Sequence, residues 1–254
     1  MDRLDGSIGE DRLLDAWDSG REDASLAGRV GALLALAGSH EGIATLPLGA
    51  ANATLLDLRI ALFGPHLVCL VDCPVCSATL ELEFSAADIR SAAPAEFPDE
   101  LTIAAAGERA RFRLPTWEDI AALAFAPVAG DADESPGDRL LRRCLIELER
   151  EGEREIAVNG AAPAAELAAA IAATMEDADP LAELRLAVTC SDCNQSFEAR
   201  LDLSEFLWTE VDARARALLE EVHVLALAYG WHEADILALT PGRRQAYLEI
   251  AINA

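Results

Sequence analysis

Apolar residues recur at helical spacing through the first 64 residues of the chain. Leu26, Val30, Leu33 and Ala37 are three or four positions apart, which is the spacing of one face of an α-helix. A further helix is predicted over residues 51–63, because Gly64 and Pro65 follow it and supply a left-handed cap and a residue that cannot continue a helix. Residues 1–64 are therefore expected to form an N-terminal helical region.

From residue 66 the period of the apolar positions changes to two. Residues 80–84 alternate leucine or phenylalanine with glutamate, and residues 184–188 and 197–203 alternate in the same way. Such alternation is typical of strands with one buried face. In both places the strands flank a Cys-x-x-Cys pair, 117 positions apart. We therefore predict an internal repeat of strand, cysteine pair and strand, in segments 65–92 and 181–203.

The segment between the two repeats, residues 93–180, has elements of its own. Apolar runs at 101–105 and 110–114 flank Gly107, which predicts a hairpin. Thr116 and Asp119 resemble a capping box that opens a helix to about residue 125. Helices are also predicted over 138–149 and 164–175. This insert is expected to form a hairpin with helices between the two halves of the repeat.

The C-terminal region, residues 204–254, has the strongest helical pattern of the chain. Ser204 is the expected N-cap of a long helix that carries Leu207, Val211, Leu218 and Val222 on one face and ends at Gly230. Shorter helices follow over 232–239 and after Thr240 and Pro241. The fold class predicted is α+β, mostly helical, with a central zinc-ribbon-like β unit assembled from two distant cysteine pairs.

The two cysteine pairs are the clearest chemical signal in the sequence. A Cys-x-x-Cys turn between strands presents two thiolates, and two such knuckles complete a tetrahedron around Zn²⁺. A redox pair would stand at a helix N-terminus, and an iron–sulfur cluster fits symmetric knuckles less well. We therefore predict one structural zinc per chain. Its ligands are Cys73, Cys76, Cys190 and Cys193.

Two details of this predicted site stay open. His66 and Cys69 lie close before the first pair, and the sequence does not decide whether either contributes to the metal site. The position after a second knuckle cysteine often adopts a left-handed conformation that favours glycine. Here that position holds Ser77 and Asn194. Asparagine tolerates this conformation better than serine, so any distortion is expected in the first knuckle.

Composition and charge exclude several functions. The chain has 45 acidic and 20 basic residues, a net charge of −25, and every basic residue is arginine. The lack of lysine excludes a lysine nucleophile and a Walker-type phosphate site. The negative field disfavours nucleic acid and anionic membranes as partners. Neither a catalytic motif nor a membrane-spanning segment is recognisable, so we expect a non-enzyme without a small-molecule substrate. The first residues do not resemble a secretory signal, and we expect a cytoplasmic protein.

Several blocks of the sequence resemble a known family. The most specific are residues 206–212, 221–223, 228–231 and 237–248; upstream blocks are residues 48–49, 62–64, the cysteine pairs, 112–116 and 179–181. They resemble the baseplate (hub assembly) proteins of contractile phage tails and phage-tail-like contractile injection systems. Ser77 and Asn194 depart from the glycines of the family pattern. The resemblance implies a structural or assembly protein whose partners are other baseplate or tail proteins, possessing no catalytic residues.

The C-terminal region also holds candidate contact residues. Aromatic residues make up 5% of the chain, and aromatic and arginine side chains are enriched at protein interfaces. The candidates are Trp208, Tyr229, Trp231, Arg243, Arg244 and Tyr247. For the arginines we expect a surface contact. For the tryptophans, packing between the C-terminal helices is an equal alternative. A zinc-ribbon nucleic-acid-binding regulator is the alternative function, against which the net charge argues.

Overall fold

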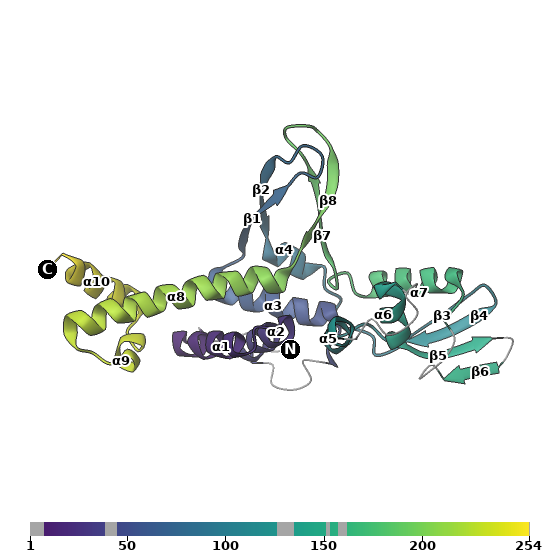
Figure 1. Cartoon of the computed structure of the whole chain (residues 1–254), viewed down its shortest axis with the longest axis horizontal. Helices are drawn as coiled ribbons and strands as arrows, with labels where there is room; N and C mark the ends of the chain where they lie inside the picture. Colours follow the sequence, from purple (N-terminus) through teal and green to yellow (C-terminus); the bar gives the residue numbers. More distant parts are fainter. Residues whose placement is uncertain (1–7, 39–44, 126–134, 151–152, 157–161, 254) are drawn as a thin grey trace.

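A computed structural model describes residues 8–38, 45–125, 135–150, 153–156 and 162–253 of the chain. The molecule is elongated, with a helical body at its centre, a β lobe at one end and a small group of helices at the C-terminal end (Figure 1). A pair of β hairpins stands out from the body as an arm. More than half of the described residues are helical, so the predicted mostly helical α+β class is confirmed.

The helical body consists of α1 (Glu10–Glu22), α2 (Leu26–Leu36), α3 (Leu48–Phe63), α4 (Ala86–Ser91) and the first half of α8 (Leu203–Tyr229). Their apolar faces form the main core, as predicted for the N-terminal region. Gly64 ends α3 with a φ of 83°, a left-handed value that suits glycine. Arg59 of α3, 4% exposed, forms a bidentate ion pair with Glu210 of α8. This pair fixes α3 against α8 beneath the arm.

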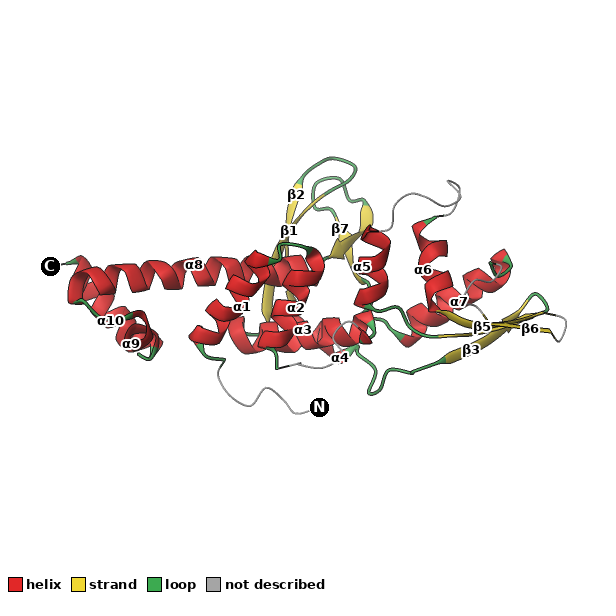
Figure 2. Cartoon of the chain, turned by 60° about the horizontal axis from the view of Figure 1, so that its bottom comes forward, coloured by secondary structure: helices red, strands yellow, loops and turns green. Residues whose placement is uncertain are grey.

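The β lobe is a four-stranded antiparallel meander. Its strands, in sheet order, are β3 (Leu101–Ala105), β4 (Glu108–Phe112), β5 (Leu145–Arg150) and β6 (Glu153–Ile156). Helix α7 (Ala165–Ala178) lies along one face of this sheet, which Figure 2 shows nearly edge-on. Phe112, Leu148, Leu167 and Ile171 form the core between helix and sheet. The hairpin predicted around Gly107 is confirmed.

The helix predicted over 138–149 is wrong in its second half. Helix α6 (Pro136–Cys144) ends where β5 begins, and β5 pairs with both β4 and β6. Leu148 is buried between two half-buried glutamates, Glu147 and Glu149, and packs in the same core as α7, which suits a strand with one face on that helix. Strand pairing in the sheet thus outweighs the helix propensity of residues 145–149.

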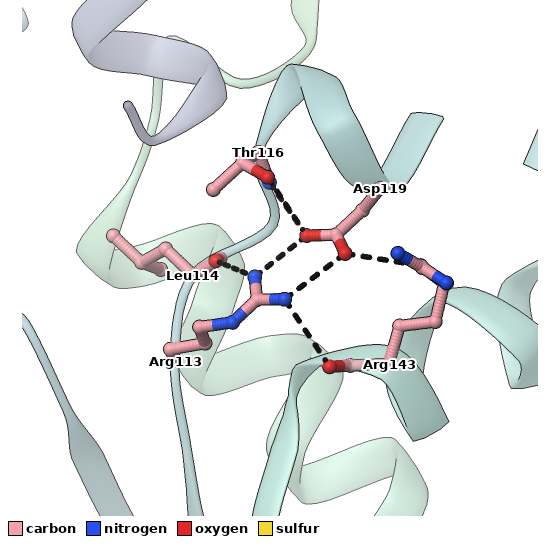
Figure 3. A network of polar contacts seen from close by, with 5 residues as sticks. All are labelled: Arg113, Leu114, Thr116, Asp119 and Arg143. Atoms are coloured by element: carbon pink, nitrogen blue, oxygen red, sulfur yellow. Dashed lines mark hydrogen bonds and ion pairs between the residues drawn. The ribbon is translucent and has the colours of Figure 1, made fainter. Parts of the chain in front are cut away.

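A buried carboxylate organises the start of α5 (Trp117–Phe125), at the junction of the lobe (Figure 3). Asp119 is 1% exposed and accepts a hydrogen bond from the backbone N–H of Thr116, which is one half of the predicted capping box. The hydroxyl of Thr116 also donates to this carboxylate, whereas the N–H of Asp119 donates to the carbonyl of Thr116. Arg113 and Arg143 also donate to the Asp119 carboxylate. Burial alone would raise the pKa of Asp119, but these hydrogen bonds and charges outweigh burial and lower the pKa to about 2.

A second buried carboxylate joins the insert to the helical body. Asp179, at the end of α7, accepts a hydrogen bond of 2.9 Å from the backbone N–H of Gly49 in the first turn of α3. The side chain of Asn52 donates to the carbonyl of Leu181 at 2.8 Å. Any Cβ at position 49 would lie 1.6 Å from Asp179 Oδ1, so this approach requires glycine. The chain therefore returns from the insert to the body at a fixed point.

The C-terminal helices pack on the far half of α8. Helices α9 (Glu233–Leu237) and α10 (Pro241–Ile252) share a small core with it, centred on Leu225, Ile236 and Leu248. Gly230 ends α8 in the left-handed conformation, as predicted. The expected N-cap is wrong: Asp202, and not Ser204, caps α8 by accepting from the backbone N–H of Glu205. None of the helices in the described ranges combines the length and apolar character needed to span a membrane.

Candidate metal centre

The arm consists of two antiparallel hairpins, as the sequence repeat predicts. The first pairs β1 (His66–Asp72) with β2 (Thr79–Ser85), and the second pairs β7 (Leu184–Thr189) with β8 (Ser196–Leu201). The hairpins belong to separate two-stranded sheets. Their bases rest on the body, where Leu67 and Leu184 are part of the main core. They rise side by side to a common tip (Figure 1).

The tip of the arm brings the four predicted cysteines together. The Sγ atoms of Cys73, Cys76, Cys190 and Cys193 all lie within 4.8 Å of one another. Across the hairpins, Cys73 Sγ is 3.7 Å from Cys193 Sγ, and Cys76 Sγ is 3.6 Å from Cys190 Sγ. A tetrahedral ion with metal–sulfur bonds of about 2.3 Å places its sulfurs about 3.8 Å apart. The four thiols are therefore spaced to hold one metal ion.

The two knuckles have the same backbone geometry. The backbone N–H of Ser77 donates to the carbonyl of Cys73 at 2.9 Å, and that of Asn194 donates to Cys190 at 3.0 Å. Ser77 has a φ of 59° and Asn194 a φ of 58°. The left-handed conformation expected after each pair is thus present. The first knuckle, where any distortion was expected, has the same geometry as the second, because Ser77 adopts the same backbone conformation as Asn194.

Burial and hydrogen bonding differ among the four thiols. Cys73 and Cys190 are buried, while Cys76 is exposed and Cys193 is half-buried. Backbone N–H groups of Cys76 and Val75 donate to Cys73 and lower its pKa to about 7. The backbone N–H of Ala78 favours the thiolate of Cys76, but burial and the neighbouring thiols outweigh it and raise that pKa to about 12. The four thiols interact closely, so they lose their protons at different pH values.

Neither of the two open candidates joins this group. Among the described residues, the group that could hold a metal ion at the tip consists of the four cysteines. It includes neither His66 nor Cys69. His66 is exposed at the base of β1, and Cys69 is half-buried in the middle of the strand. The candidate site therefore consists of the four cysteine sulfurs alone.

The predicted contact residues of the C-terminal region are placed differently from one another. Arg243 is exposed, but Arg244 is 1% exposed, so its expected surface contact is wrong. Arg244 donates to Glu10 at 2.7 Å and to Glu221, because the charge is buried only where carboxylates of α1 and α8 neutralise it. Trp208 is also buried in the main core, 6% exposed. Its role there is packing.

The three remaining aromatic residues pack on one another. Tyr229 stacks on Trp231 with ring centroids 4.7 Å apart, and Tyr247 meets both rings edge-on. All three side chains are partly buried against the small C-terminal core. Both tryptophans are thus used for packing within this chain, as one of the two alternatives predicts.

A cavity of about 780 Å³ lies between α3, the segment after α4 and the start of α5. Alanine, proline, leucine and threonine dominate its lining, which contains neither histidine nor cysteine. Its two arginines are engaged elsewhere, Arg90 by Asp57 and Arg113 by Asp119. Asp99 and three threonines are the other polar residues of the described lining. No sequence pattern indicates this cavity, because it forms where three distant segments meet.

Comparison with known proteins adds no relative to this description: no protein-family model matches the sequence, and neither a curated protein nor a solved structure shows significant similarity to the chain.

Proposed function

We propose that the four cysteines bind one structural Zn²⁺ and that the chain is a non-catalytic structural or assembly protein of a contractile phage-tail-like baseplate. The observation that carries the proposal is the cluster of four thiols at the tip of the arm. A tetrahedral set of four sulfurs selects zinc or iron among the common metals. Zinc is favoured because two single-turn knuckles between strands are the usual setting of structural zinc.

The chemistry of the site supports a structural role. Four thiolates leave no open coordination position, so the ion cannot activate water. Zinc would instead cross-link two segments that are more than 110 residues apart in sequence. Among the described residues, the lining of the cavity near α3 contains neither histidine nor cysteine. These observations favour a protein that acts through its surfaces.

The assignment to a baseplate rests on the sequence resemblance, and the fold gives its blocks a physical meaning. Residues 48–49 and 179–181 resemble the family, and in this chain they meet in the hydrogen bond from Gly49 to Asp179 and in the contact of Asn52 with Leu181. Residues 112–116 approach the same point, where the N–H of Leu48 donates to the carbonyl of Pro115. Separate blocks thus specify one junction, which is what a shared fold requires.

The alternative, a zinc-ribbon regulator that binds nucleic acid, is disfavoured by the charges on the arm. The first hairpin holds three acidic residues and no arginine. In the second hairpin, Arg185 and Arg200 both pair with Glu183. Binding to a phosphate backbone requires unpaired positive charge. A gel-shift measurement at low salt with DNA and RNA is expected to show no complex.

Deletion of the gene in its own host tests the main proposal. We expect assembled tail-like particles to disappear and to return with the wild-type gene. The purified protein should contain about one zinc per chain by elemental analysis. Normal particles in the deletion strain would refute the baseplate role. A protein that folds at full stability without metal, or contains iron, would refute the structural zinc.

A further inference from the structure

The two hairpins of the arm are repeats, so each position in one has an equivalent in the other 117 residues away. The inward positions agree in character. Leu67, Val71 and Phe84 correspond to Leu184, Val188 and Leu201, and all six are buried or half-buried. These positions need apolar side chains because the faces of the two hairpins cover one another and the body.

The outward positions of the two hairpins do not agree. In the first hairpin they include Val68, Leu70 and Val75, whose exposed fractions are 41%, 67% and 65%. The equivalent residues of the second hairpin are Arg185, Ala187 and Asp192. Since the second hairpin forms the same strands and the same knuckle with these residues, the fold does not require large apolar side chains at the outward positions. We call Val68, Leu70 and Val75 the apolar strip.

Acidic side chains border the apolar strip. Val68 lies opposite Glu83 and Leu70 opposite Glu81 in the register of β1 and β2, and both glutamates are exposed. Asp72 is exposed on the same face. The hairpin contains neither arginine nor lysine, so these carboxylates form no ion pair with such a residue within it, although the Thr79 hydroxyl donates to Asp72. In the second hairpin, by contrast, arginine and glutamate side chains form ion pairs with each other at the base.

We propose that the apolar strip is a docking face for a partner protein, whose bound segment has apolar side chains flanked by arginine or lysine. The apolar residues supply the buried contact and the three carboxylates select a basic partner. A second copy of this chain would bring a like charge of −25 and the same glutamates onto the face. That the partner is a tail protein rests on the proposed function. The chemistry of the partner's bound segment is inferred from the residues of the arm.

A photo-crosslinking amino acid placed at position 70 in the native host tests this proposal. We expect one dominant crosslink, mapped by mass spectrometry to a basic and apolar segment of another protein. Adding the changes Val68→Arg and Val75→Asp, which bring in the residues of the second hairpin, should reduce the crosslink about tenfold or more. The same crosslinker at position 187, the equivalent site of the second hairpin, should not give this product.

Controls separate docking from folding. Leu227, exposed on α8 to 75%, provides a matched change, because Leu227→Ala removes an exposed leucine away from the arm. Metal content and melting temperature should be unchanged in all of these variants. Crosslinks to a second copy, to lipid or to an acidic segment, or an unaltered crosslink in the double variant, would overturn the docking face.

The two proposals can fail separately. If the mapped segment is basic and apolar but belongs to a protein outside the tail, the docking face stands and the baseplate role fails. If deletion of the gene abolishes particles but Val68→Arg with Leu70→Ala and Val75→Asp restores them fully, the baseplate role stands and the docking face fails.

Discussion

Substitution of one buried cysteine, Cys190→Ser, tests how the arm is held together. Cys190 is fully buried at the tip, and its thiol is one of the four within 4.8 Å. A serine hydroxyl cannot replace the thiolate as a ligand for a soft metal ion. We expect the variant to lose its metal and the two hairpins to separate, because a two-stranded hairpin is at best marginally stable alone.

The magnitude follows from the length of chain that the metal closes. Cys73 and Cys193 are 120 residues apart, and a cross-link over about 100 residues contributes roughly 4.7 kcal/mol against the fully unfolded chain. With the body folded, however, Leu67 and Leu184 are already held in one core. The metal then closes only the short path along β1 and β7, like a loop of about 15 residues, which contributes roughly 3 kcal/mol.

Hydrogen exchange followed by mass spectrometry can distinguish local opening from global unfolding. A loss of about 3 kcal/mol accelerates exchange roughly a hundredfold in β1, β2, β7 and β8, while amides of α3 and the first half of α8 should stay protected. Cys69→Ser, in β1 of the other hairpin and outside the cluster, is the control and should keep its metal. Unchanged exchange in the arm of the metal-free Cys190→Ser variant would refute the structural role.

Two further predictions concern the junctions of the insert. Gly49→Ala should destabilise the protein by about 2–5 kcal/mol in urea unfolding, because its Cβ would overlap Asp179 Oδ1 and break a buried hydrogen bond. Gly31→Ala, with open space around its Cβ in α2, is the control and should be neutral or slightly stabilising. Equal stabilities of the two variants would contradict the close approach of Gly49 to Asp179. The pKa of Asp119 is about 2 in the folded protein, against an ordinary value of 3.8. At pH values above 3.8 its charge therefore contributes about 2 kcal/mol to the free energy of unfolding, and this contribution is lost as the pH falls toward 2. The difference in unfolding free energy between the parent and Asp119→Asn should therefore shrink between about pH 5 and pH 2, and a constant difference would show that the carboxylate charge is not stabilising.

The sequence predicts the local chemistry of this chain well, because the relevant signals are local. Each cysteine pair lies between alternating strands, and spacing alone indicates two equivalent knuckles. Gly64 and Gly230 end helices as predicted, since a left-handed cap depends on one residue. One half of the Thr116 capping box is also present, the hydrogen bond from the Thr116 N–H to Asp119, and two arginines from outside the helix donate to the same carboxylate.

What could not be predicted depends on contacts between distant residues. The helix assigned over 138–149 fails because pairing with β4 and β6 makes a strand of its second half. Arg244 reads as a surface charge in sequence, and its burial follows only from the meeting of Glu10 and Glu221, which are separated by 211 positions. The role of Gly49 is likewise invisible without Asp179, which is 130 residues away.

The insertion of a whole lobe between the two halves of the four-cysteine cluster has a physical condition. The four thiols can meet only if both hairpins start from fixed places, and the core supplies these through Leu67 and Leu184. The contact of Asp179 with Gly49 fixes the chain just before β7, so the lobe does not have to align the second knuckle. The arm is thus held at its base by apolar packing and is suited to being held at its tip by a metal. The apolar strip extends from β1 to the first knuckle, between these two anchors, so its strand enters a docking contact already ordered, which lowers the entropy cost of binding.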